Sequence, residues 1–90
     1  MKTFNDLVFE KHPMGIGIQA RIQFDNGFGA SVVKGRYTYG GPQGLYEVAV
    51  LDQDGQLTYD TMITDDVIGH LTEQDVTDVL AQIQSLTNNQ

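Results

Sequence analysis

Carboxylates are the side chains of this sequence with the clearest capacity for chemistry, and they are unevenly placed. The chain of 90 residues has 12 Asp and Glu side chains against five Lys and Arg, giving a formal net charge of −7. Every Lys and Arg lies at or before Arg36, so the remaining stretch cannot neutralise itself and favours a basic partner. The candidate binding acids of that stretch are Glu47, Asp52, Asp54, Asp60, Asp65, Asp66, Glu73, Asp75 and Asp78.

The acids between Asp52 and Asp60 have a spacing that suggests the start of a calcium loop. Such a loop needs a bidentate Glu at its twelfth position. Counting from Asp52 or from Asp54 gives Ile63 or Asp65 at that position instead. The spacing therefore favours a plain hairpin turn, and a cation held in the segment from Asp52 to Asp60 is the alternative.

Asp65 and Asp66 form a second group of acids, which could serve acid–base chemistry or hold Mg²⁺. They follow Thr64, a residue type that caps helices, and acids in a first helical turn suit the positive end of the helix dipole. We therefore interpret Thr64 to Gly69 as a short helical turn. The sequence predicts no metal site and no cofactor.

The His and Ser residues of this sequence do not form a recognisable pattern for nucleophilic catalysis. His12 precedes a proline, and His70 lies between two predicted elements. Ser31 falls in a predicted strand and Ser85 late in a predicted helix, and neither resembles a strained turn that exposes a nucleophile. Cysteine is absent, which removes thiol chemistry and disulfides. The sequence predicts that the protein is not an enzyme.

Three tyrosines, Tyr37, Tyr39 and Tyr46, flank a glycine-rich loop. Aromatic residues beside such a loop are typical of binding surfaces, but they also fill cores and cover sheet faces. Both interpretations stay open for these three residues. Lys34 and Arg36 lie nearby, where they could hold an anionic group of a ligand or contact the acids of a second subunit.

The sequence predicts several β-strands, and these strands would position the candidate binding residues. Residues from Gly15 to Phe24 alternate between apolar and polar side chains, which is typical of a half-buried antiparallel strand. Asn-Gly then supplies a hairpin turn, followed by a partner strand at Phe28–Tyr37. Leu45–Leu51 and Leu57–Ile63 are predicted as the third and fourth strands.

The end of the chain changes to a helical period. Thr72 can cap a helix, and apolar residues follow at helical spacing on one stripe. That stripe is formed by Val76, Val79, Leu80, Ile83 and Leu86. A further short strand or turn is expected at Leu7–Phe9.

These elements predict an α+β fold: a four-stranded antiparallel meander with one C-terminal amphipathic helix packed on one sheet face. The length predicts a single small domain over residues 1–90, with a frayed tail at residues 87–90. The charge argues against direct binding to nucleic acid or to an anionic membrane. We find no apolar run long enough for a membrane span and no signal peptide, and we expect a cytoplasmic protein.

Three stretches, Phe24–Val33, Gly44–Leu51 and Tyr59–Gly69, resemble sequences of small, mostly uncharacterised proteins encoded by bacteriophages and prophages. The resemblance covers most of the chain, from about Leu7 to Leu86. It brings no active-site residues, but it implies a genomic setting and the cytoplasm of a bacterial host. Inhibition of a host protein, as by anti-CRISPR and other antidefence proteins, is the role that the resemblance implies.

Three binding hypotheses follow, from different classes. The first is an acidic inhibitor that binds a basic host protein, such as a nucleic-acid enzyme, by nucleic-acid mimicry. The second is a homodimeric phage structural or accessory protein that pairs through the tyrosines and a sheet edge. The third is a binder of a small anionic ligand that uses Arg21, Lys34 and Arg36.

Overall fold

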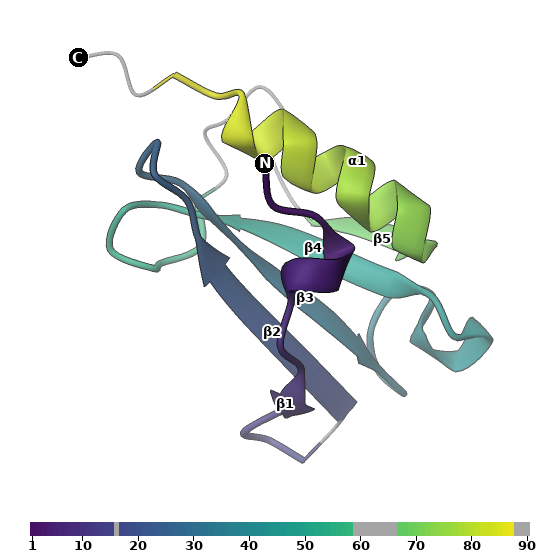
Figure 1. Cartoon of the computed structure of the whole chain (residues 1–90). Coiled ribbons are helices and arrows are strands. Elements are labelled where there is room, and N and C mark those ends of the chain that lie inside the picture. The colour runs from purple at the N-terminus through teal and green to yellow at the C-terminus, as the bar shows by residue number, and fades with distance from the viewer. Residues whose placement is uncertain (16, 59–66, 88–90) are drawn as a thin grey trace.

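A five-stranded antiparallel sheet and one C-terminal helix make up the computed structural model, which describes residues 1–15, 17–58 and 67–87 (Figure 1). The strands follow one another across the sheet in chain order, from β1 to β5. Their bounds are β1 (Glu10–Lys11), β2 (Gly17–Gln23), β3 (Gly29–Gly35), β4 (Tyr46–Leu51) and β5 (Ile68–Leu71). The helix α1 spans Glu73–Gln84, and two short 3-10 turns, η1 and η2, span Phe4–Asp6 and Gly41–Gln43.

The central hairpin of β2 and β3 forms because apolar and polar side chains alternate along β2 and because a glycine lies in the turn that joins the two strands. Ala20 pairs with Val32 and Ile22 pairs with Ala30, so the apolar residues of both strands lie on one face. Gly27 has a φ of 90°, which is the left-handed backbone that a glycine adopts without strain. Both predicted strands are confirmed, each shorter than predicted by a few residues at its ends.

Helix α1 covers the apolar face of the sheet. Thr72 caps the helix together with Asp75: each side chain accepts a hydrogen bond from the other's backbone N–H, at 3.1 Å. The buried helix residues pack against apolar residues of β3 and β4 in one cluster. That cluster contains Ala30, Val32, Tyr46, Val48, Val50, Val76, Val79, Leu80 and Ile83. The predicted apolar stripe is therefore confirmed for its four residues in α1, whereas Leu86 packs against the cluster from beyond the helix end.

The N-terminal segment crosses the same face beside the helix (Figure 1). Phe4 and Phe9 pack on Tyr46, with ring centroids 5.2 and 5.7 Å away. Gln84 of the helix bonds both backbone groups of Lys2, each at 2.8 Å. The short strand or turn expected at Leu7–Phe9 is not found there: β1 begins one residue later, at Glu10, and Phe9 packs against the core.

The predicted number of strands is wrong: the sheet has five strands, not four. In the described part of the chain, three of the predicted strands appear as β2, β3 and β4, and the other two strands of the sheet are its edges, β1 and β5. Of the predicted fourth strand, Leu57 bridges Leu51 and the Thr58 N–H donates to the Val50 carbonyl at 2.9 Å. The remaining residues of that strand lie outside the described part of the chain.

The predicted helical turn at Thr64–Gly69 is wrong where the structure describes it, because Ile68 and Gly69 belong to β5. Ile68 pairs with Val48, and a Cβ on Gly69 would overlap the side chain of Tyr39. Gly69 therefore allows a close approach rather than ending a helix. His70 follows with a φ of 58°, at a register shift between β4 and β5.

Within the described part of the chain, no helix is long and apolar enough to cross a membrane.

Candidate functional site

The acids of α1 lie on a helix whose charged side chains are all negative. Glu73 and Asp78 are exposed, whereas Asp75 is half-buried in the helix cap. Asp78 accepts a hydrogen bond from the Gln74 amide at 3.1 Å. The sequence has no Lys or Arg after Arg36, so the last turn of α1 carries no basic side chain either.

The acids that follow β4 have a different setting, because a cation lies beside them. The Asp52 carboxylate accepts the backbone N–H groups of Asp54 and Gln56, at 2.9 and 3.0 Å, and so shapes the tight turn that the spacing indicates. Arg21 of β2 donates to the Gly55 carbonyl of the same turn. This turn is therefore less negative than its two acids suggest.

The remaining predicted acids are Glu47 and three residues outside the described part of the chain. Glu47 is half-buried on β4 and accepts the Tyr39 backbone N–H at 3.0 Å. Asp60, Asp65 and Asp66 lie outside the described residues, as does any cation site that includes them. The described acids of the predicted set thus occupy three places: α1, the turn after β4, and β4 itself.

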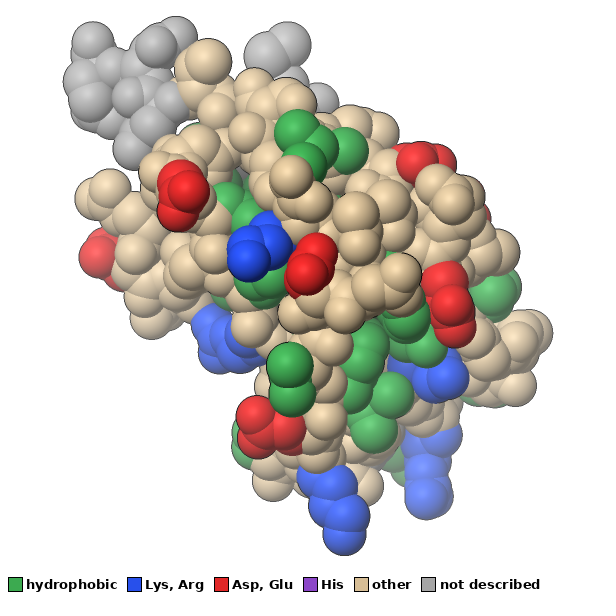
Figure 2. All heavy atoms as spheres, in the orientation of Figure 1, with side chains coloured by type: hydrophobic (Ala, Val, Ile, Leu, Met, Phe, Trp, Pro, Cys, Tyr) green, Lys and Arg blue, Asp and Glu red, His purple; other side chains and the backbone are tan. Residues whose placement is uncertain are grey.

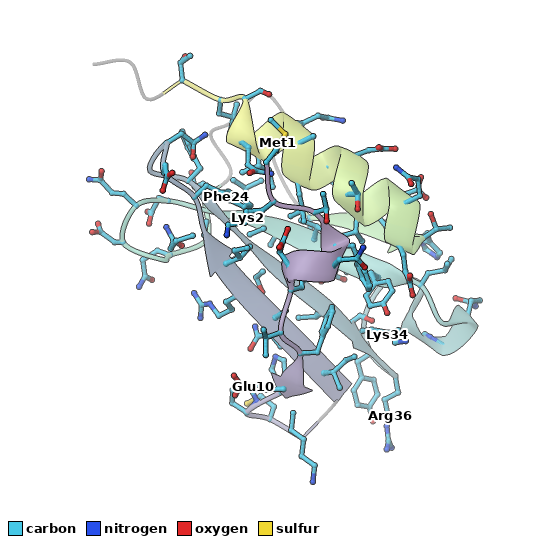
Figure 3. The ribbon with its side chains drawn as sticks, in the orientation of Figure 1. Met1, Lys2, Glu10, Phe24, Lys34 and Arg36 are labelled. Carbon is cyan, nitrogen blue, oxygen red and sulfur yellow. The ribbon has the colours of Figure 1, made fainter. Side chains whose placement is uncertain are left out.

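The view in Figure 2 shows the charges of one side of the molecule. Red carboxylates are spread over this side, while blue Lys and Arg side chains lie in its lower part and also near its middle, beside red carboxylates. Figure 3 labels Lys34 and Arg36 in the lower part, where β3 finishes. The asymmetry along the sequence therefore becomes a partial asymmetry in space, with α1 as its acidic part.

The three tyrosines separate into two surface residues and one core residue. Tyr37 is 74% exposed and Tyr39 is 60% exposed, but Tyr46 is only 7% exposed. Tyr46 lies on the same strand face as Val48 and Val50, an alternation that could have indicated its burial from the sequence. Only Tyr37 and Tyr39 can contribute to a binding surface.

The three cations proposed for an anionic ligand are not brought together. Arg21 lies on the sheet face turned away from α1, beside the turn after β4. Lys34 lies against Tyr46, with Nζ 3.5 Å from the hydroxyl and 4.8 Å from the ring centroid. Arg36 lies 5.9 Å from the ring centroid of its neighbour Tyr37. The geometry therefore does not favour one anion held by all three.

The histidines and serines show no catalytic arrangement among the described residues. The Nδ1 atom of His12 accepts the Met14 N–H at 3.1 Å, and the Ser31 hydroxyl accepts from the Gln19 amide at 3.1 Å. An amide cannot act as the general base that a serine nucleophile needs. In the described ranges, no group of three or more His, Asp or Glu side chains is placed to hold a metal ion.

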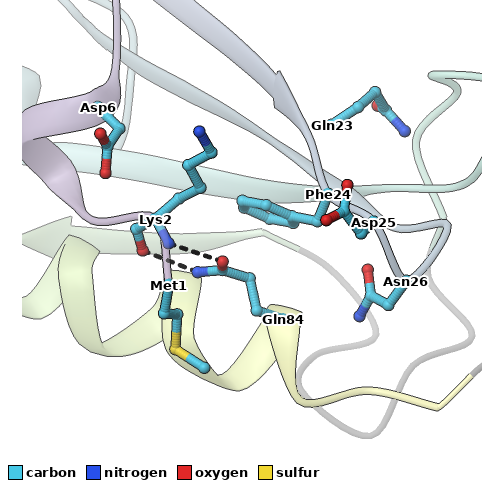
Figure 4. Close-up of a pocket in the computed structure, with 8 residues that line it drawn as sticks. All are labelled: Met1, Lys2, Asp6, Gln23, Phe24, Asp25, Asn26 and Gln84. Carbon is cyan, nitrogen blue, oxygen red and sulfur yellow. Dashed lines mark hydrogen bonds between the residues drawn. The ribbon is translucent and has the colours of Figure 1, made fainter.

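Two cavities were not predicted from the sequence, although Tyr37 and Glu47 of the predicted set line the second one. The first, of about 570 Å³, lies between the N-terminal segment, the hairpin turn and the end of α1 (Figure 4). Its polar groups are used to join these elements: Gln84 holds Lys2, and the Asn26 amide donates to the Ile83 and Leu86 carbonyls at 2.8 and 3.0 Å. We interpret this cavity as a structural junction.

The second cavity, of about 480 Å³, lies on the sheet face turned away from α1, which we call the far face. Residues of β2, β3 and β4 line it, including Gln19, Arg21, Ser31 and Glu47. The alternation of β2 predicts that Gln19 and Arg21 lie away from the helix. No local signal joins Arg21 to Gly55, because 34 residues separate them.

Comparisons of the chain with protein families, curated proteins and solved structures found no match.

Proposed function

We propose that the protein is a small acidic binding protein of the phage type, which associates stoichiometrically with a basic surface of a host protein and inhibits it. The observation that supports this function is the charge of α1, whose ionisable side chains are acidic without exception. A groove that normally holds nucleic acid is the kind of basic surface that we propose as its target. The resemblance to phage proteins motivates the choice of a host protein.

The arrangement of the helix acids suits such a partner. Asp75 and Asp78 are three residues apart and therefore lie on neighbouring turns of one helix side, where like charges repel. A basic surface placed against them would relieve this repulsion. Glu73 and Asp78 are exposed, so a partner can reach them without opening the fold.

Electrostatic complementarity of this kind raises the association rate and depends on ionic strength. Exposed charges are screened over about 8 Å at physiological salt, so binding through them weakens as salt is added. The buried cluster beneath α1 holds the helix in place while its outer side makes contact. Binding therefore needs no conformational change of the described elements.

Affinity capture from bacterial lysate, at low and at high salt, tests the proposal when two variants of equal charge are compared. The test variant, Glu73→Gln with Asp78→Asn, removes two exposed helix acids and leaves the Thr72–Asp75 cap intact. The control variant, Glu10→Gln with Asp25→Asn, removes two exposed acids from other elements.

We expect the unmodified protein and the control to retain the same host protein at low salt, and the test variant to lose it. The captured protein should then lose activity when the unmodified protein is added in equimolar amount. Capture that is equal for both variants, or unchanged at high salt, would contradict the proposal. Failure to retain any host protein at low salt would contradict it as well.

Tyr37 and Tyr39 favour a second candidate function, a homodimer. Both rings are exposed, and Arg36 lies 5.9 Å from the ring centroid of Tyr37, where its charge could meet the acidic helix of a second copy. This candidate predicts a dimer that forms with rising concentration and is weakened by Tyr37→Ser with Tyr39→Ser. Sedimentation that shows a monomer at every concentration would remove it.

A further inference from the structure

We infer that the far-face cavity binds a small dipolar molecule, with a carboxylate at one end and an ammonium group at the other. The molecule's carboxylate would bind Arg21, and its ammonium group would bind Glu47. This site is separate from the proposed contact between α1 and a host protein, so either can hold without the other.

The cavity has opposite charges on its two sides because of the sheet register. Arg21 of β2 pairs with Ser31 of β3, while Glu47 of β4 pairs with Val33. The two charged residues thus flank β3 from opposite sides, and they are two residues apart along the strand direction. Strand spacing of about 4.8 Å and a rise of about 3.3 Å per residue put their Cα atoms roughly 12 Å apart.

Both charged groups keep hydrogen-bonding capacity for a ligand. A guanidinium has five N–H donors, and the contact shown for Arg21 uses one nitrogen, on the Gly55 carbonyl. A carboxylate can accept about four hydrogen bonds, and the contact shown for Glu47 is the Tyr39 N–H. These contacts also fix the two side chains in position before a ligand arrives, which lowers the entropic cost of binding.

The floor between the two charges combines polar groups that can orient a ligand with buried apolar side chains. Ser31 is only 7% exposed, and its hydroxyl accepts a hydrogen bond from the Gln19 side-chain amide at 3.1 Å. Ala49 and Leu51 are buried beside it, at 8% and 1% exposure. A cavity of about 480 Å³ is within the usual size range for small-molecule sites.

The separation of the charges selects the length of the ligand. The contacts of the two side chains draw them toward opposite ends of β4, because Gly55 follows its last residue and Tyr39 precedes its first. We therefore expect an α-amino acid to be too short to reach both charges. An ω-amino acid with several methylene groups, or a short peptide, spans more of the distance and places its methylenes over Val33. The inferred ligand class is therefore an extended dipolar molecule.

Nuclear magnetic resonance titration with glycine, 4-aminobutyrate and 6-aminohexanoate tests the inference. Butylamine and butyrate provide controls that each carry one of the two charges. We expect saturable shifts of the Ser31, Val33 and Ala49 backbone amide signals with the longer dipolar probes. Glycine and both single-charge probes should bind about tenfold more weakly, since each loses one charge-assisted contact.

Two conservative variants and two matched controls complete the test. Arg21→Gln and Glu47→Gln should each weaken binding of the best dipolar probe about tenfold, while keeping a polar group for the Gly55 and Tyr39 contacts. Lys11→Gln and Asp25→Asn make the same charge changes on other elements and should bind as the unmodified protein does.

The inference is wrong if the cavity signals do not move with any probe, or if single-charge probes bind as tightly as the dipolar ones. It is also wrong if the Arg21 and Glu47 variants, shown to be folded by their amide spectra, bind the best dipolar probe like their controls. None of these results bears on capture of a host protein by α1, so the two proposals can fail separately.

Discussion

The two faces of the sheet are made from alternate residues of the same strands, but different interactions hold them. On the helix side, Val32 and Val48 are fully buried beneath α1 and the N-terminal aromatic residues. On the far face, Arg21 and Gln23 reach across to backbone carbonyls of the turn after β4. The comparison teaches that the main apolar cluster lies on the helix side, whereas the far face combines buried Ala49 and Leu51 with polar side chains that contact the turn after β4.

Truncation of the core is expected to have the largest effect and to separate the two faces most clearly. Leu80→Ala removes a fully buried side chain and should lower the free energy of unfolding by about 2–5 kcal/mol. Val33→Ala, on the far face, removes a half-buried side chain and should cost less than about 1.5 kcal/mol. Urea unfolding of both variants measures the difference, and equal losses would contradict the comparison.

Asn26→Ala should have the next largest effect, because one side chain of the hairpin turn supports the end of α1. Its amide donates to the Ile83 and Leu86 carbonyls, and its side-chain oxygen accepts the Phe28 N–H at 3.1 Å. Loss of these bonds should lower the free energy of unfolding by about 1–3 kcal/mol.

Hydrogen exchange locates this effect. The amides of the last turn of α1 should lose protection in the Asn26 variant more than the amides of β3 do. Asp25→Asn, which changes the neighbouring exposed residue, is the control and should leave both regions as they are. Uniform loss of protection over the whole chain would mean that Asn26 does not act on the helix end.

Arg21→Gln should have the smallest effect on stability. Arg21 is exposed, and a contact of an exposed charged side chain contributes less than about 1 kcal/mol. Thermal unfolding should therefore show a midpoint within a few degrees of the unmodified protein. A much lower unfolding midpoint would mean that the fold of the far face depends on Arg21, and that the charge of Arg21 has a structural role.

Much of the fold was predictable because local patterns specify it. Alternation and the Asn-Gly turn defined β2 and β3, and the helical period with Thr72 defined α1. The strand β5 was missed because Ile68 to Leu71 is short and lacks alternation. It forms through pairing with β4 and through the His70 N–H, which donates to the Tyr39 carbonyl at 3.0 Å.

The candidate sites were predictable only in part, because some of their contacts join residues that are far apart in the sequence. The charge asymmetry is a property of the sequence, and the charged residues of α1 are all acidic. The neutralising contact of Arg21 with the turn after β4 is long-range, and no sequence pattern near either residue indicates it. The burial of Tyr46 had a signal in the alternation of β4, but its position beside a glycine-rich loop suggested a surface.

The salt dependence of binding to the captured host protein tests the central claim most directly. Dissociation constants at several ionic strengths should be compared for the unmodified protein, the Glu73→Gln/Asp78→Asn variant and the Glu10→Gln/Asp25→Asn variant. We predict that the helix variant binds at least about tenfold more weakly at low salt and depends less on salt, while the other variant matches the unmodified protein. Equal affinities and equal salt dependence for all three would contradict recognition through the acidic helix.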